Sequence, residues 1–202
     1  MRILRLVVMT LSDAATASRI VVSPLFFVAF FLPRWTAFPE STSVIVIWGL
    51  FLIIEGSDLV DGAIARRLSQ ISDTGKLLDP FADSLSRLTY FFCFTTIGLM
   101  PVWIFLILLY RDLGVGYIRL LVLRRNVVQS ARLSGKLKAW IYAIAGMAGI
   151  IAITGNAFGF ESAVTARSVA RLTFYFAGAV ALWSIIDYLS VIAKRRGERS
   201  PI

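Results

Sequence analysis

The amino-acid sequence predicts an all-α polytopic membrane protein, with six transmembrane helices preceded by an amphipathic helix that lies in the membrane interface. Apolar residues make up 58% of the 202 positions, and the mean hydropathy of +0.79 lies far above the soluble range. These residues form six long runs, and a spanning helix needs roughly 20 mostly apolar residues. The single cysteine, Cys93, excludes a disulfide framework within the chain.

The first segment, residues 1–18, is too polar to span a bilayer. Arg2 and Arg5 stand among apolar residues there, which is typical of a helix lying along the membrane surface. We therefore expect an interfacial helix over 1–18, a membrane domain over 19–195 and a cytoplasmic tail over 196–202.

The six apolar runs follow one another with short polar connections. Pro24 interrupts the first run, and a proline can kink a spanning helix without forbidding it. This run continues straight into a polytopic array, so no cleavable signal peptide is expected. The expected spans are 19–38, 43–65, 79–100, 102–123, 137–156 and 170–193.

The formal net charge of +9 is distributed unevenly. Six spans place both termini and the loops 66–78 and 124–136 on one side, and most lysines and arginines lie there. Basic loops stay in the cytoplasm, where they also contact anionic lipids, so this side is expected to face inward. The chain has no soluble basic module that would bind nucleic acid.

Four aspartates interrupt the apolar pattern: Asp58, Asp61, Asp79 and Asp83. The first two are spaced i,i+3 and the last two i,i+4, so each pair lies on one face of its helix. Carboxylates in a bilayer are costly and call for a compensating ion or substrate. Two such faces turned together would form an all-oxygen site for a hard divalent cation.

The depth of these aspartates in the membrane follows from the helical rise. Asp58 lies about 22 Å from Ser43 along the second span, in the inner part of a hydrocarbon core about 30 Å thick. The third span begins at Asp79 on the same side. The carboxylates are therefore expected just inside the cytoplasmic leaflet, within reach of both lipid headgroups and water-soluble molecules.

Small and basic residues accompany the aspartates. Gly62 and Ala65 leave a bare helix surface on which a flat group can lie. Arg66 carries a planar guanidinium suited to a phosphate. Gly75 precedes the expected third helix and permits a tight turn or a close approach of ligand. Pro80 is expected in the first turn of that helix, where its missing N–H costs little.

These residues form one connected pattern, Asp58-x2-Asp61-Gly62-x2-Ala65-Arg66-x8-Gly75-x3-Asp79-x3-Asp83. The pattern resembles the signature of the CDP-alcohol phosphatidyltransferase family, with every fixed position filled at the same spacing. The resemblance implies a homodimer of six-helix protomers with a site that opens to the cytoplasm and holds a pair of Mg²⁺ or Mn²⁺ ions. It implies that Asp58, Asp61, Asp79 and Asp83 bind metal, that Asp83 is the general base, and that Gly62, Ala65, Arg66 and Gly75 line the site for the CDP moiety.

The chemistry of such a transfer agrees with these roles. A pyrophosphate diester needs a divalent cation to neutralise its charge and activate the leaving phosphate. The attacking hydroxyl must lose its proton, and a positioned carboxylate that accepts it typically contributes about 10²–10⁴-fold. The chain has no histidine, which excludes histidine-based acid–base or phosphoenzyme schemes.

The acceptor alcohol is expected to be glycerol 3-phosphate. The stretches 77–83 and 134–138 resemble the family members that use this acceptor, and Arg111-Asp112 stands where those members carry Arg-Glu. A phosphorylated acceptor needs cations near Asp83, although Arg87 could instead be the counter-ion of that aspartate. Inositol phosphate would need a similar pocket and stays open. The candidate cations are Arg87, Arg111, Arg119, Lys136 and Lys138.

Two other classes of protein use carboxylates in a membrane. Intramembrane prenyltransferases bind Mg-pyrophosphate through paired aspartate motifs, but they lack the Asp-Gly-x2-Ala-Arg run. Divalent-cation transporters line a permeation path with carboxylates, whereas these aspartates cluster at one leaflet. The expected partners are therefore CDP-diacylglycerol, glycerol 3-phosphate and the bilayer of a bacterial cytoplasmic membrane.

Overall fold

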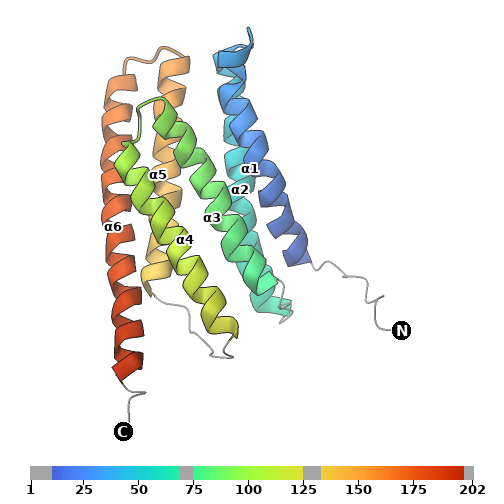
Figure 1. Cartoon of the computed structure of the whole chain (residues 1–202). Helices are drawn as coiled ribbons and strands as arrows, with labels where there is room; N and C mark the ends of the chain where they lie inside the picture. The colour runs from blue at the N-terminus through green and yellow to red at the C-terminus, as the bar shows by residue number, and fades with distance from the viewer. Residues whose placement is uncertain (1–10, 69–74, 125–132, 198–202) are drawn as a thin grey trace. The chain divides into compact units, whose positions relative to one another are not determined.

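The computed structural model of the chain is built of helices (Figure 1). It describes the backbone of residues 11–68, 75–124 and 133–197, and the side chains of 17–57, 80–118, 135 and 137–190. Within this part the helices are α1 (Leu11–Trp35), α2 (Glu40–Leu68), α3 (Gly75–Thr96), α4 (Val102–Arg124), α5 (Leu133–Ala157) and α6 (Ala163–Gly197).

The prediction of an all-helical fold is confirmed, and each expected span falls on one helix. Helix α1 begins at Leu11 and continues without a break past residue 18, whereas residues 1–10 of the expected interfacial helix lie outside the described part. Among the described residues, four stretches are long and apolar enough to cross a membrane. They are Ala17–Trp35, Glu40–Ser57, Leu137–Ala157 and Ala163–Ser190.

The start of α3 differs from the sequence expectation. Helix α3 begins at Gly75, so this glycine opens the helix and Pro80 lies inside it, not in its first turn. Proline fits the first turn of a helix best, which is why the sequence placed the boundary near Asp79. A proline inside a long helix is also tolerated where nearby groups satisfy the carbonyl that it leaves free.

The first of two compact units comprises residues 1–90. Helices α1 and α2 lie side by side in it (Figure 1), and the Ser43 hydroxyl donates a 2.6 Å hydrogen bond to the Ala29 carbonyl between them. Tyr90 of α3 is fully buried and packs against Phe26 of α1 and Phe51 of α2, with ring centroids 6.2 and 5.6 Å away. These aromatic contacts form the core that holds α1, α2 and α3 together in this unit.

The second unit comprises residues 91–202, in which α6 contacts both α4 and α5. Its core is aromatic. Phe91 packs edge-on against Tyr142 at 5.5 Å and against Phe174 at 6.1 Å, and Phe94 lies 5.9 Å from Phe174. All four rings are fully buried, so they fix α3, α5 and α6 against one another within this unit.

Glycines end two of these helices. Gly98 follows α3 with a φ of 68°, its N–H donates to the Thr95 carbonyl, and the Leu99 N–H donates to the Phe94 carbonyl. This pair of bonds is the Schellman arrangement, which satisfies carbonyls at the helix end and needs a left-handed residue. Gly159 ends α5 with a similar φ of 66°.

The contact between Gly149 of α5 and the Phe94 ring gives a stability prediction. A Cβ atom on Gly149 would lie 2.7 Å from the ring Cζ, closer than atoms can pack. We expect Gly149→Ala to destabilise the protein by about 1–3 kcal/mol through overpacking, measured by thermal unfolding in detergent. Gly114→Ala on α4, where a Cβ meets nothing within 4 Å, should be neutral or stabilising. Equal stability of the two variants would contradict this packing.

Candidate active site

The aspartate pattern falls on two helices. Asp58, Asp61, Gly62, Ala65 and Arg66 belong to α2, and Gly75, Asp79 and Asp83 belong to α3. Of these, only the side chain of Asp83 is among those that the structure describes. The metal-binding and nucleotide-binding roles of the others therefore stay predictions, while the helical spacing that places each aspartate pair on one face is as expected.

Asp83 is held by Arg87, one turn further along α3. The Nη1 atom of Arg87 lies 2.9 Å from Oδ1 and 3.0 Å from Oδ2 of the carboxylate. The Asp83 side chain is 25% exposed, whereas that of Arg87 is 3% exposed. One side of the carboxylate is thus fixed by a buried cation and the other remains accessible. These contacts favour the role of counter-ion for Arg87.

A second carboxylate, Glu55 of α2, binds the same arginine. Arg87 donates from Nε to Oε1 at 3.2 Å and from Nη2 to Oε2 at 3.0 Å. The Tyr90 hydroxyl donates to Oε1 at 3.1 Å. Glu55 was not among the predicted site residues. The sequence feature that could have indicated it is its position three residues before Asp58, near the helical face that Asp58 shares with Asp61.

The electrostatics of this group follow from its composition. Two carboxylates face one guanidinium, so the three side chains carry a formal charge of −1. Hydrogen bonds between ionised groups are about twice as strong as neutral ones, and the fork of an arginine makes two parallel bonds to a carboxylate. Arg87 is therefore held firmly by both carboxylates.

A second charged group lies in residues 91–202. Asp112 of α4 accepts hydrogen bonds from Lys138 Nζ of α5 at 2.8 and 2.9 Å and from Arg111 Nη1 at 3.0 Å. Arg111 also donates from Nη2 to the Ser184 hydroxyl of α6 at 2.7 Å. Lys138 lies 4.6 Å from the centre of the Tyr142 ring. All of these side chains are buried.

The structure thus brings together two of the expected acceptor-binding cations, Arg111 and Lys138, on one carboxylate. Two cations and one carboxylate leave this group with a formal charge of +1. Asp112 and Ser184 were not predicted as part of it, although a carboxylate inside an apolar span signals a need for counter-charges. The side chains of Arg119 and Lys136 lie outside those described.

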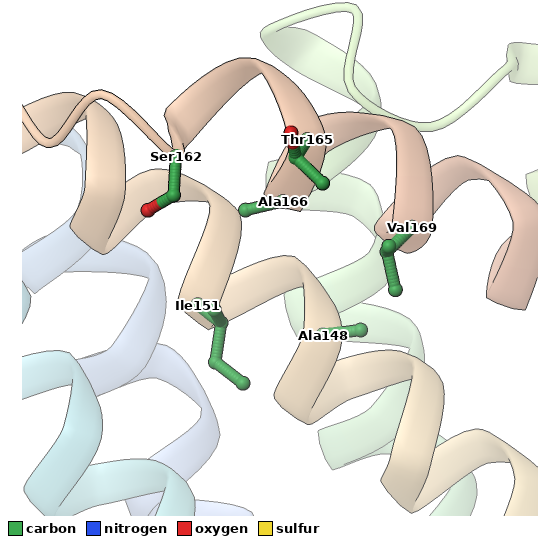
Figure 2. A pocket seen from close by; sticks show the side chains of 6 residues that line it. All are labelled: Ala148, Ile151, Ser162, Thr165, Ala166 and Val169. Atoms are coloured by element: carbon green, nitrogen blue, oxygen red, sulfur yellow. The ribbon is translucent and has the colours of Figure 1, made fainter.

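A shallow groove of about 290 Å³ lies between α5 and the start of α6 (Figure 2). Its lining is apolar apart from two hydroxyl groups and includes no charged side chain. It therefore offers van der Waals contact and no group for acid–base or phosphate chemistry. The lining residues are Ala148, Ile151, Ser162, Thr165, Ala166 and Val169.

Comparison with known proteins agrees with the motif. Residues 9–186 match the CDP-alcohol phosphatidyltransferase family, and the chain belongs to this family. A CDP-diacylglycerol–glycerol-3-phosphate 3-phosphatidyltransferase of Treponema pallidum (strain Nichols) is 34% identical over 190 residues, which are 90% of this chain and 88% of that protein.

Two further relatives are similar over shorter stretches. The protein with the same name in Bacillus subtilis (strain 168) is 32% identical over 67% of this chain and 73% of its own. A probable phosphatidylglycerophosphate synthase of Mycobacterium tuberculosis (strain ATCC 25618 / H37Rv) is 32% identical over 67% of this chain and 63% of its own. The prediction of a membrane-bound transferase of phospholipid biosynthesis is confirmed, which sets aside the prenyltransferase and cation-transporter alternatives.

The buried group around Asp112 gives a second stability prediction. Asp112→Asn leaves Arg111 and Lys138 buried without their shared counter-charge, and breaking a buried ion pair costs about 3–5 kcal/mol. We expect a loss of this size in the free energy of unfolding, measured with denaturant in detergent. The exposed Glu161→Gln change in the same unit is the matched control.

The double variant Asp112→Asn/Lys138→Met should recover part of this loss, because it removes one of the two stranded cations along with the carboxylate. An Asp112→Asn protein as stable as the Glu161→Gln control would show that the ion pairs do not hold α4 against α5.

Proposed function

We propose that this protein transfers the phosphatidyl group of CDP-diacylglycerol to a hydroxyl of glycerol 3-phosphate, forming phosphatidylglycerophosphate and releasing CMP. The observation that carries the proposal is the similarity, over 90% of the chain, to a protein named for this reaction. The complete aspartate pattern and the hydrogen-bonded, partly exposed Asp83 support it.

In this reaction Asp83 is the general base. The acceptor oxygen forms a bond to the phosphorus of the phosphatidyl group while the bond from that phosphorus to CMP breaks. Asp83 takes the hydroxyl proton, which typically contributes about 10²–10⁴-fold. Arg87 fixes the orientation of the carboxylate from its buried side, so the exposed side faces the incoming alcohol.

The carboxylates of the aspartate pattern support binding of a divalent cation, although the described side chains include no group of three or more such ligands. The group around Asp83 has one carboxylate more than it has cations, and carboxylate oxygens are the ligands that Mg²⁺ and Mn²⁺ prefer. Asp58, Asp61, Asp79 and Asp83 would hold a pair of these ions. Bound metal would neutralise the pyrophosphate and stabilise CMP as the leaving group. The CDP moiety would lie against Gly62, Ala65, Arg66 and Gly75.

The acceptor phosphate is bound by cations in this proposal. Arg111 and Lys138, which share Asp112, are the candidates, together with Arg119 and Lys136. Arg87, also expected as a candidate, is bound to Glu55 and Asp83 instead. An inositol phosphate acceptor would use the same cations and is the alternative substrate. A phosphorylated acceptor can form charge-assisted hydrogen bonds with these cations and an uncharged acceptor cannot, which makes uncharged acceptors poorer substrates.

We further propose that all six helices cross a bacterial cytoplasmic membrane, with α3 and α4 joining the four apolar spans. The N-terminal residues 1–18 include an amphipathic segment at the interface, and the site faces the cytoplasm. The clustering of basic residues in the termini and in the loops after α2 and α4 supports this orientation. The protein is expected to be a homodimer.

The reaction is tested with purified protein, CDP-diacylglycerol and Mg²⁺ against a panel of alcohols, with CMP release as the readout. We expect glycerol 3-phosphate to be the best acceptor, ahead of inositol phosphate, serine and choline. Chelation of the metal should stop the release, and Mg²⁺ or Mn²⁺ should restore it. A strong preference for inositol phosphate would overturn the acceptor, and release of pyrophosphate instead of CMP would overturn the reaction.

The role of Asp83 is tested by Asp83→Asn. An amide cannot take the hydroxyl proton, so turnover should fall by about 10²-fold or more. Binding of CDP-diacylglycerol, measured by equilibrium binding of the labelled lipid, should persist and would show that the variant is folded. Glu40→Gln, an exposed change in the first turn of α2, is the control. Near-native turnover of Asp83→Asn would remove Asp83 as the base.

A further inference from the structure

We infer that Glu55, which lies outside the aspartate pattern, is a positioning residue that orients Asp83 through Arg87. The inference rests on the proposed function, in which Asp83 is the general base. Glu55 does not touch Asp83 in the contacts described; the two carboxylates bind different nitrogens of one guanidinium.

The planar geometry of Arg87 explains how Glu55 can orient the Asp83 carboxylate. Its guanidinium is planar and rigid, and Nε and Nη2 both donate to Glu55 at 3.2 and 3.0 Å. Fixing these two nitrogens also fixes the direction of Nη1, which meets the Asp83 carboxylate at 2.9 and 3.0 Å. The position of the base therefore depends on a residue of α2, across the contact between α2 and α3.

Glu55 is itself held by the core. The Tyr90 hydroxyl donates to Glu55 Oε1, and the Tyr90 ring packs edge-on against Phe51 and at a tilt against Phe26. The two ends of this network differ in exposure, because the Tyr90 side chain is fully buried and that of Asp83 is 25% exposed. Between them, the Glu55 side chain is 14% exposed and that of Arg87 is 3% exposed, so the network joins the aromatic core to a partly exposed carboxylate.

Glu55 also limits how Asp83 can bind Arg87. A single carboxylate beside Arg87 could take both ends of the guanidinium fork. With Glu55 bound to Nε and Nη2, Asp83 meets Nη1 in the described contacts. Glu55 thus restricts Asp83 to one end of the guanidinium.

A purely structural ion pair would behave differently. It would change the amount of folded protein and leave the turnover of each folded molecule as it is. Turnover is therefore expressed per molecule that binds CDP-diacylglycerol, which separates the two roles. Replacements in residues that orient functional groups typically cost about 10–100-fold in activity.

The test compares Glu55→Gln with Glu40→Gln, the same chemical change at an exposed position of the same helix. We expect Glu55→Gln to lower kcat by about 10–100-fold, with KM for glycerol 3-phosphate and the binding of CDP-diacylglycerol unchanged. Glu40→Gln should match the wild type. Glu55→Asp, which keeps the charge, should recover part of the loss.

A double-mutant cycle tests whether Glu55 acts through Arg87. Arg87→Gln alone leaves two carboxylates facing each other, whereas Glu55→Gln/Arg87→Gln restores the net charge of −1. If the effect passes through Arg87, then Glu55→Gln should cost less than about 3-fold once Arg87 is replaced, because coupled sites are not additive. Tyr90→Phe keeps every charge and removes only the hydroxyl that holds Glu55, so a smaller loss of kcat is expected there.

The outcomes separate the inference from the proposed function. If the wild type releases no CMP from CDP-diacylglycerol with any alcohol, the proposed function fails and the role of Glu55 fails with it. If the wild type is active and Glu55→Gln is equally active, only the role of Glu55 fails. That role also fails if Glu55→Gln costs as much with Arg87 replaced as with Arg87 present, or if its loss of turnover equals its loss of lipid binding. Should Glu55→Gln not fold, Glu55→Asp and Tyr90→Phe decide by the same criteria.

Discussion

A buried arginine shared by two carboxylates is the constraint on which the site around Asp83 depends. A charge removed from water is stable only when it is paired and hydrogen-bonded, and the Arg87 side chain is 3% exposed. Asp83, Arg87 and Tyr90 recur at i, i+4 and i+7 on α3, which places them on one helical face. That face meets Glu55, so these contacts fix the rotation of α3 relative to α2 around Asp83.

The buried charges around Asp112 are also paired and hydrogen-bonded, but the formal net charge of that group is positive. There one carboxylate pairs with two cations, Arg111 and Lys138, and joins α4 to α5, while Ser184 joins α6 through the arginine. The group near Asp83 keeps a net charge of −1 and this one keeps +1. A net negative group suits the binding of a metal ion, and a net positive one suits the binding of a phosphate. These are the roles proposed above for the two groups.

The sequence predicted the helices well, because each is encoded locally by its apolar run and by glycines such as Gly98 and Gly159 that end helices. It misplaced the start of α3, since a proline such as Pro80 is tolerated both in a first turn and inside a long helix. The contacts of Glu55 with Arg87 and of Asp112 with Lys138 could not be predicted from the sequence, for a different reason. These partners lie 32 and 26 residues apart. Helices that are apolar on most sides carry little information about which face meets which neighbour.

Stability alone does not account for these charges. Replacing a buried ion pair by apolar residues of similar volume is often neutral or stabilising by about 1–4 kcal/mol, so a membrane domain selected only for stability would have leucine at such positions. A site that moves a charged phosphoryl group has another requirement, because its dipoles and charges must be oriented before the substrate arrives. The role inferred for Glu55 meets this requirement, since Glu55 binds Arg87, which in turn binds Asp83.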